Sequence, residues 1–218
     1  RPLTLQRFPD GIGESGFFQK NTPDYFPDWI ERVDLPKEGG TVTHAIANEA
    51  ATLVYLADQG CITLHLALAR AESPKHPDRM VFDLDPADED FGKVQEAASA
   101  VRDALDARGL ASFVSATGSR GLHVVLALDG SVDVDALRPF ARGLAAEVAE
   151  AHPDLATTEQ RKDKRGDRVL IDTFRTAYGQ TAVGPYTVRA RRGAPVATPL
   201  RSDEALASDM TPDRNTIG

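Results

Sequence analysis

The sequence is poor in the residues that cross-link a chain or anchor it in a membrane. It contains a single cysteine, Cys61, which excludes an internal disulfide and favours a reducing cytoplasm. No apolar run approaches the roughly 20 residues that a membrane span needs, and no signal peptide opens the chain. The opening, RPLTLQRFPDG, reads as mature sequence, so we expect the natural N-terminus to lie upstream.

Basic residues are outnumbered, and the formal net charge of −8 by itself argues against a nucleic-acid partner. The distribution of charge argues the other way. Residues 83–109 contain eight acids and three bases, whereas residues 161–192 contain nine bases and three acids. The first stretch suits cations and the second suits polyanions, although two solvated faces would give the same counts.

The remaining composition is that of an ordinary globular protein, with 41% hydrophobic and 27% charged residues. A chain of 218 residues can form one large domain or two small ones. We find no repeat and no convincing boundary. We therefore expect a single domain over residues 1–218, in which the polar segment 200–218 wraps the surface or frays.

Hydrophobic periodicity predicts helices that alternate with strands. We expect helices at 43–60, 91–109 and 133–153, and strands at 61–69, 79–85, 122–128, 168–174 and 186–191. The segment before residue 41 is rich in turns. The apolar face of the first helix is expected to be Ile46, Ala50, Leu53, Val54 and Ala57. Because several elements read as hairpins, the sequence predicts an α+β fold with a mixed, largely antiparallel sheet flanked by helices.

The stretch MVFDLDPADED places two carboxylates in an apolar strand. By strand alternation Asp83 and Asp85 share one face, while Phe82 and Leu84 point into the core. Two anions roughly 7 Å apart repel each other, and both ionise favourably only when a cation lies nearby. The alternative is a strand edge at which the aspartates meet lysine, arginine or water.

A third carboxylate, Asp172, lies in the apolar stretch VLIDTF. If its strand neighbours that of Asp83, three carboxylates complete an oxygen cage for two divalent ions. Asp172 alone is weak support, because a lone acid in a strand is more often hydrogen-bonded locally.

The stretch SATGSRGLHV places two glycines, three hydroxyls and Arg120 just before a strand. Small residues and exposed backbone N–H groups there can hold phosphates, although the P-loop pattern is absent and a flexible turn is the alternative. His65 and His123 lie on strands, where either one alone would more often be a satisfied histidine than a ligand.

Two arginines, Arg189 and Arg191, share a face if YTVRARR is a strand. Guanidinium groups side by side suit a triphosphate, because each can bind phosphate oxygens bidentately. A charged strand edge that prevents aggregation would look the same.

The order of these motifs is more specific than any one of them. RFPDG, FFQKNTPDYFPDWI, HPDRMVFDLDP, TGSRGLHV, DRVLID and TAVGPYTVRARRGAPVATPL together resemble the polymerase domain of bacterial ATP-dependent DNA ligase D. The likeness runs from residue 1 to about residue 200. That family belongs to the archaeo-eukaryotic primase superfamily and serves non-homologous end joining, so the resemblance implies a primase-like fold.

The resemblance also implies roles for individual residues. The catalytic, metal-binding carboxylates would be Asp83, Asp85 and Asp172, with two divalent ions, Mn²⁺ or Mg²⁺, as cofactors. Phe17 and Phe18 would stack on template bases, since every base has a π-face. The nucleotide-binding residues would be His65, Thr117, Arg120, His123, Arg165, Arg175, Arg189 and Arg191.

The implied activity is transfer of a nucleotide, preferably a ribonucleotide, to a primer 3′-hydroxyl at gaps and broken ends of DNA. The implied partners are DNA, nucleoside triphosphates, the DNA-end-binding protein Ku and a ligase domain, but no membrane. The implied location is the bacterial cytoplasm, at the nucleoid.

The sequence departs from the family at its start. The N-terminal part, where lysines engage a downstream 5′-phosphate, is absent, and Gln6 replaces a commonly basic residue. No KxDG motif is present, so we expect no ligation from this chain. The competing interpretations are a stand-alone primase-polymerase for gap filling or lesion tolerance, a DNA-end-binding module without catalysis, and a DxD phosphatase. The phosphatase needs a small hydroxyl residue at position 87, where Ala87 stands.

Overall fold

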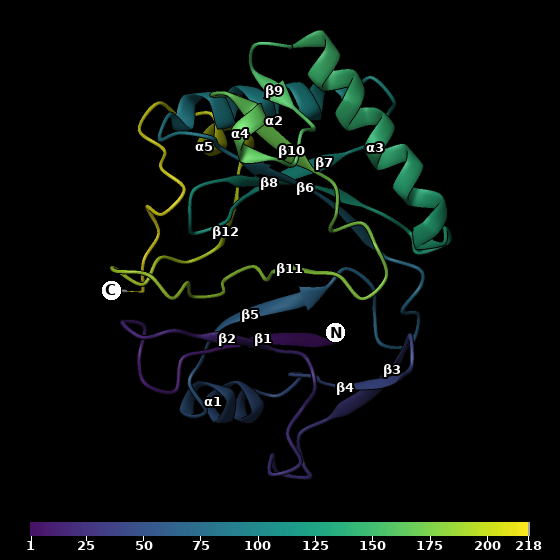
Figure 1. The fold of residues 1–218 in the computed structure, drawn as a ribbon, viewed down its shortest axis with the longest axis vertical. Helices are drawn as coiled ribbons and strands as arrows, with labels where there is room; N and C mark the ends of the chain where they lie inside the picture. The colour runs from purple at the N-terminus through teal and green to yellow at the C-terminus, as the bar shows by residue number, and fades with distance from the viewer. Residues whose placement is uncertain (218) are drawn as a thin grey trace.

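The computed structural model describes residues 1–217 and shows two β-sheets stacked one above the other, with helices on the outer side of the upper sheet and a single helix below the lower one (Figure 1). The chain begins in the lower sheet, builds most of the upper sheet and then returns to add β11 to the lower one. The faces that the two sheets turn toward each other therefore carry residues from distant parts of the sequence.

The upper sheet has the strand order β12-β7-β8-β6-β10-β9, and all its pairings are antiparallel except β9 with β10. Its strands are β6 (Arg79–Asp85), β7 (Ser112–Ala116), β8 (Leu122–Ala127), β9 (Ala156–Thr157), β10 (Val169–Asp172) and β12 (Thr198–Leu200). The helices above it are α2 (Phe91–Asp106) and α3 (Val134–Ala151), with the short α4 (Lys162–Arg165) and α5 (Ser202–Ala205) beside them.

The main hydrophobic core lies between this sheet and its helices. Phe82 and Leu84 point into it from β6, as strand alternation predicted. The predicted apolar face of α2, which includes Val94 and Val101, is completely buried against them. Asp90 starts this helix by accepting a hydrogen bond from the Gly92 N–H at 3.0 Å.

The lower sheet has the order β11-β5-β1-β2. Its strands are β1 (Leu3–Arg7), β2 (Phe17–Gln19), β5 (Cys61–Ala67) and β11 (Thr181–Val183), and α1 (Ala50–Asp58) lies below it. A separate hairpin is formed by β3 (Arg32–Lys37) and β4 (Gly40–Ala45). A smaller second core, which includes Leu5, Phe26 and Leu56, holds this part together.

The α+β class with largely antiparallel sheets is confirmed, and two of the three predicted helices form close to their predicted bounds. The prediction for the first helix was wrong at its start and on its face. Residues 43–45 belong to β4, where they pair with residues 32–34 of β3. Helix α1 buries Thr52 and Leu56, while Leu53 and Val54 are 46% and 70% exposed.

The predicted strand at 186–191 was also wrong, since only Val188 makes a bridge there, to Val196. A turn that contains Gly193, with φ of +83°, folds this segment back on itself instead. Residues 201–217 are mostly exposed, but Ala205 and Met210 are buried in the main core and hold this segment against the upper sheet. Within residues 1–217, no helix is both long and apolar enough to cross a membrane.

Candidate functional site

The strand register brings the three aspartates onto one face of the upper sheet. Strands β6 and β10 pair so that Asp172 lies directly opposite Asp83, and Asp85 lies opposite Leu170. Directly opposed residues of antiparallel strands project to the same side, and so do residues two apart on one strand. Their shared face is opposite to the one that carries Phe82 and Leu84 into the core.

The three carboxylates differ in their surroundings. Burial raises the pKa of Asp83, but ion pairs to His123 Nε2 at 3.4 Å and Arg175 Nε at 3.5 Å outweigh it and leave the pKa below its usual value. Burial raises the pKa of Asp85, and the charges of Asp83 and Asp172 raise it further. Burial likewise raises the pKa of Asp172; the hydrogen bond from the Phe174 N–H opposes this shift, and the charge of Asp83 adds to it. Such mutual repulsion is what a bound cation would relieve.

The donor chemistry fits a hard divalent cation, since all three residues offer carboxylate oxygens. Their side chains, however, do not yet enclose one. Over residues 1–217 no group of three His, Cys, Asp or Glu side chains is gathered as a metal centre. Asp83 is held by His123 and Arg175, and Asp172 accepts a hydrogen bond from the Phe174 N–H at 2.8 Å. The strand register therefore places the three carboxylates on one face of the sheet, and their oxygens keep lone pairs that these partners do not use.

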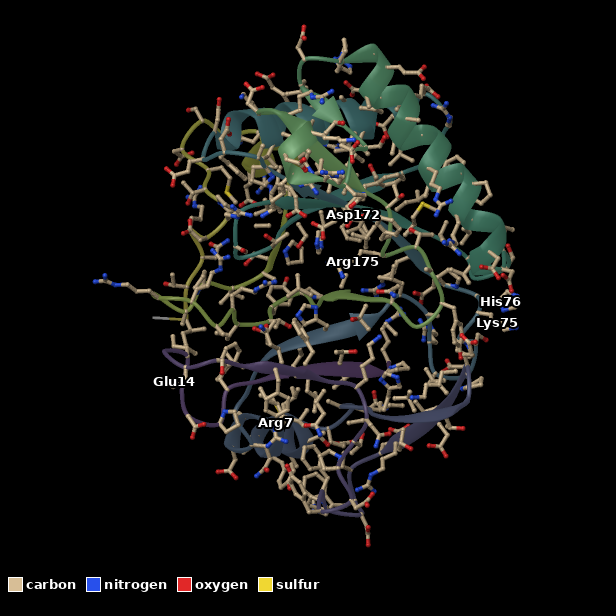
Figure 2. The ribbon with its side chains drawn as sticks, in the orientation of Figure 1. Arg7, Glu14, Lys75, His76, Asp172 and Arg175 are labelled. Atoms are coloured by element: carbon tan, nitrogen blue, oxygen red, sulfur yellow. The ribbon has the colours of Figure 1, made fainter. Side chains whose placement is uncertain are left out.

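A cavity of about 180 Å³ between the two sheets collects most of the predicted residues. It receives Asp83 and Asp85 from β6, and it receives His65 from β5 of the opposite sheet. Figure 2 shows Asp172 and Arg175 close together on the underside of the upper sheet. The predicted residues that line the cavity are His65, Asp83, Asp85, Thr117, Arg120, His123, Arg175, Arg189 and Arg191. Asp172, Arg165, Phe17 and Phe18 do not line it.

The predicted phosphate loop is the turn at residues 117–121, which joins β7 to β8, so that a strand precedes it as well as follows it. Thr117 Oγ1 donates to the Gly121 carbonyl at 2.9 Å and accepts from the Gly121 N–H at 3.3 Å. A side chain at Gly121 would overlap the carbonyl oxygen of Leu84, which lies between the two β6 aspartates. The loop is thus packed directly against the strand that carries the carboxylates.

His65 supplies an unpaired polar group to the cavity. Its Nε2 is buried and has no hydrogen-bond partner. Burial, reinforced by the charges of Arg189 and Arg175, lowers its pKa to about 4, so the ring is neutral at physiological pH. A neutral imidazole with a free ring nitrogen can donate or accept one hydrogen bond to a ligand.

The arginines surround the carboxylates from two directions. Arg189 and Arg191 reach the cavity from an irregular segment rather than from a strand, so the predicted geometry was wrong although the location was right. Burial lowers the pKa of Arg189, and the neighbouring charge of Arg191 lowers it further. Arg165 is buried outside the cavity, where it donates to the carbonyls of Glu159 at 2.8 Å and Gln160 at 2.6 Å. Its charge still acts on Asp85 and Asp172.

Phe17 and Phe18 lie on the edge strand β2, and their side chains are 46% and 61% exposed. The ring of Phe18 makes an edge contact with His65, with ring centres 5.3 Å apart. Phe18 therefore adjoins the cavity without entering it, whereas Phe17 lies on the other face of β2, where Arg7 packs over its ring.

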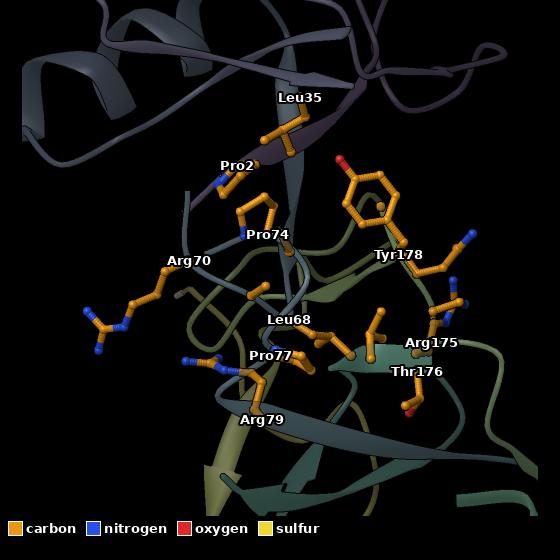
Figure 3. Close-up of a pocket in the computed structure, with 16 residues that line it drawn as sticks. Pro2, Leu35, Leu68, Arg70, Pro74, Pro77, Arg79, Arg175, Thr176 and Tyr178 are labelled. Atoms are coloured by element: carbon orange, nitrogen blue, oxygen red, sulfur yellow. The ribbon is translucent and has the colours of Figure 1, made fainter. Parts of the chain in front are cut away.

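A second hollow beside the site lacks nearly all of the predicted site residues. Figure 3 shows its walls, which are mainly proline and aliphatic side chains together with Tyr178 and the arginines 70, 79 and 175. Of the predicted residues it shares only Arg175 with the cavity, and its free volume of about 30 Å³ is too small for a nucleotide.

Sequence reasoning missed some of the cavity wall. Ser119 was counted among the hydroxyls of the loop but given no role, although it lines the cavity. Ala182 and Val183 line it from β11, a strand of three residues with no readable pattern. Their contribution depends on β11 pairing with β5, which is distant in sequence.

Comparison with known proteins agrees with this geometry. The family model described as the primase-polymerase domain of LigD matches residues 1–218. The chain is 33% identical over 208 residues to the multifunctional non-homologous end joining DNA repair protein LigD of Mycobacterium tuberculosis, covering 91% of this chain and 27% of that protein. It is 31% identical over 219 residues to the bifunctional non-homologous end joining protein LigD of Bacillus subtilis, covering 100% of this chain and 35% of that protein.

A solved structure titled as the polymerase domain from Mycobacterium tuberculosis ligase D in complex with DNA superposes with a TM-score of 0.87 at 32% identity, over 94% of this chain and 75% of that one. The chain thus spans about a third or less of the full-length relatives but most of this single domain. The two-sheet fold and the order of its motifs are those of one domain of a larger repair protein. This chain belongs to the LigD primase-polymerase domain family.

Proposed function

We propose that this domain is a template-dependent nucleotidyltransferase that adds nucleotides, preferably ribonucleotides, to primer 3′-ends at gaps and broken ends during non-homologous end joining. One observation carries the proposal. The β6–β10 register places Asp172 opposite Asp83, on the face that borders a cavity lined by arginines, a glycine-rich loop and an unpaired histidine. Carboxylates beside a polycationic pocket are what phosphoryl transfer from a triphosphate requires.

Asp83, Asp85 and Asp172 would hold two divalent ions, Mn²⁺ or Mg²⁺. When bound, such ions activate the attacking 3′-hydroxyl and stabilise the leaving oxygen of pyrophosphate. His123 and Arg175 contact Asp83 at 3.4 and 3.5 Å and would help to hold this carboxylate in place. Arg175 also lines the cavity, where it would contact phosphate.

The remaining cavity residues would bind the incoming nucleotide. Arg120, Arg189 and Arg191 supply positive charge for the triphosphate, and guanidinium groups bind phosphate oxygens in pairs. Thr117 lines the cavity and would contact the nucleotide, and its two bonds to Gly121 hold the loop closed. His65 would direct its free Nε2 to the nucleotide, and Arg165 would support the carboxylates from outside the cavity.

Phe17 and Phe18 would stack on template bases at the rim of the cavity. The DNA partners would be gaps and broken ends, and the protein partners would be Ku and a ligase domain, as expected for a component of end joining. Such a protein would work in the bacterial cytoplasm at the nucleoid.

Primer extension with a ribonucleotide and Mn²⁺ tests the proposal. We expect Asp83→Asn, which preserves the size of the side chain, to lower extension by at least about 100-fold because a metal-binding charge is lost. Asp83→Ala should lower extension to the same extent. Asp106→Asn, at the exposed end of α2, is the matched control and should extend like the unaltered domain.

Binding of the primer–template, measured by fluorescence anisotropy, should persist in the Asp83 variants because the basic residues are untouched. Extension that survives in Asp83→Asn would refute the assignment of the carboxylates. Absence of extension by the unaltered domain, with DNA binding intact, would indicate a DNA-end-binding module without catalysis.

A further inference from the structure

Four large aromatic side chains are exposed within a short stretch at the start of the chain. Phe17, Phe18, Tyr25 and Trp29 have exposed fractions of 46%, 61%, 63% and 56%. Exposed aromatic rings are costly in water when they gather on one surface, and such gatherings usually mark an interaction site. Only the first two have a role in the function proposed above.

Direct contacts connect the first pair to Tyr25. The guanidinium carbon of Arg7 lies 5.7 Å from the centre of the Phe17 ring, and Arg7 Nη1 donates to Tyr25 Oη at 2.7 Å. Arg7 is itself buried and also bonds Gln19 Oε1 at 2.9 Å and the Gln59 carbonyl at 3.0 Å. One rigidly held cation therefore fixes Phe17 and Tyr25 relative to each other.

Edge contacts between rings continue the series from Tyr25 to Trp29. Tyr25 meets Phe26 with ring centres 5.3 Å apart, Phe26 meets Tyr55 at 5.1 Å, and Tyr55 meets Trp29 at 5.9 Å. Phe26 is only 2% exposed and belongs to the lower core, so it anchors the rings on either side. Tyr25 and Trp29 are 63% and 56% exposed despite these contacts, so part of each ring remains available to a ligand.

The exposed aromatic residues Phe17, Phe18, Tyr25 and Trp29 form a surface. It starts at the catalytic cavity and passes around the edge of the lower sheet. Phe18 touches His65, which lines the cavity, whereas Phe17 and Arg7 are directly opposite each other in the β1–β2 pairing. Successive side chains of β2 point to opposite faces, so the two phenylalanines lie on either side of that strand. Strand β2 ends the sheet order, which leaves this edge free for a chain to pass.

The charges nearby favour stacking over phosphate binding. Lys20 is exposed, but Asp28 and Glu31 are exposed too, and the guanidinium of Arg7 is buried. A DNA duplex presents mainly phosphates to a protein, because its base faces are covered by stacking. A duplex would therefore make few contacts with this aromatic surface. An unpaired strand presents base faces, and each stack on an aromatic ring is tolerant of sequence.

We propose that Tyr25 and Trp29 extend the template-binding surface, so that unpaired template bases leaving the cavity pass over the edge of β2 and stack on these two rings. The ligand is single-stranded DNA continuous with the primer–template. The inference rests on the proposed function, because it takes the cavity as the place where the template is copied. It adds a binding segment that acts only on substrates with several unpaired template nucleotides.

The chain offers a direct probe, because Trp29 is its one tryptophan. A base stacked on this ring should quench its fluorescence. We expect primer–templates with an unpaired template overhang on the order of eight nucleotides to quench strongly, and one-nucleotide overhangs or blunt duplexes to quench little. Equal quenching by blunt and long-overhang DNA would overturn the proposal, and so would absence of quenching at saturating long-overhang DNA.

Variants separate stacking from folding. Trp29→Ala should weaken binding of the long-overhang DNA by about 5- to 100-fold, the loss typical of one base–aromatic stack, while Trp29→Phe should keep most of the affinity. Phe113→Ala is the matched control, since Phe113 is 47% exposed on the upper sheet, and it should bind normally. Because stacking is neutral, the ratio of affinities between the unaltered domain and Trp29→Ala should not change with salt. If the loss of affinity in Trp29→Ala disappears at high salt, the effect is one of charge and stacking is refuted.

Primer extension distinguishes failure of this inference from failure of the proposed function. Trp29→Ala should extend primers on one-nucleotide overhangs at the normal rate, which also shows that the variant is folded. If the unaltered domain extends primers but Trp29→Ala binds long overhangs normally, only the additional surface is refuted. If a protein competes with DNA for this surface and DNA itself does not quench Trp29, the aromatic residues serve a partner protein and the proposal fails.

Discussion

Asp83, Asp85 and Asp172 are chemically alike, yet each has a different environment. Contacts with His123 and Arg175 lower the pKa of Asp83 and overcome its burial, whereas burial and neighbouring carboxylates raise the pKa values of Asp85 and Asp172. One carboxylate is therefore paired, and the other two face neighbouring negative charge. A cation would be bound most favourably where these environments meet.

Cys61 gives a test at the scale of one residue. Burial raises its pKa from an ordinary 9.0 to about 11, and the thiolate is the reactive form. We expect its reaction with a thiol reagent at pH 8 to be on the order of 100-fold slower in the folded domain than in urea, as followed by the absorbance of the released product. A fast reaction in the folded state would show that β5 opens readily.

The pH dependence of stability should follow from the same shift. The folded state holds the Cys61 proton more tightly than the unfolded state, so this contribution is fully present below pH 9 and is lost as the pH rises through about 11. Cys61→Ser should lessen that loss, measured as the midpoint of urea unfolding between pH 8 and pH 11.

At the scale of elements, the carboxylate strand and the glycine-rich loop form one packed unit. Gly121 approaches the Leu84 carbonyl so closely that any side chain would overlap it, and Leu84 stands between the two aspartates of β6. The loop cannot shift without moving β6. The position of the phosphate-binding loop relative to the carboxylates is therefore set by backbone contact rather than by flexible side chains.

Gly121→Ala should consequently destabilise the domain by about 1–3 kcal/mol and impair extension, because the loop must move away from β6. Gly143→Ala is the matched control. Gly143 lies inside α3 with nothing within 4 Å of an added methyl group, so this change should be neutral or stabilise by up to about 1 kcal/mol. Urea unfolding measures both effects, and equal stabilities of the two variants would contradict the close packing of the loop.

At the scale of the whole molecule, the segment that follows β12 contributes Ala205 and Met210 to the main core. Strand β12 pairs with β7, and beyond it Ala205 and Met210 are 1% and 3% exposed. A segment that is polar on average thus closes one side of the upper sheet. The upper half of the site depends on residues more than a hundred positions after β6.

Met210→Ala should lower the free energy of unfolding by about 2–5 kcal/mol, the usual cost of emptying a buried methionine site. Leu206→Ala, at a side chain that is 49% exposed, should cost less than about 1 kcal/mol. Urea unfolding with tryptophan fluorescence follows both, since Trp29 reports from the lower sheet. A small effect of Met210→Ala would mean that the end of the chain contributes little to the fold.

The sequence by itself determined the elements that have strong local patterns. Strand β6 and the buried face of α2 were predicted correctly, because long runs with period 2 or 3.6 identify a strand or a helix with one apolar face. Short strands such as β2 and β11, with three residues each, carry no such period. They form only because neighbouring strands complete their hydrogen bonds. The buried face of α1 is likewise determined by the sheet against which the helix packs.

The same division holds for the site. The sequence determined which residue types are present and that Asp83 and Asp85 share a face, since alternation is a property of the strand alone. Only the tertiary structure decided that Asp172 stands opposite Asp83, that His65 crosses from the other sheet, and that Arg165 lies outside the cavity. These positions follow from strand register and from the stacking of two sheets. Both are set by contacts between residues far apart in the chain, for which no local pattern exists.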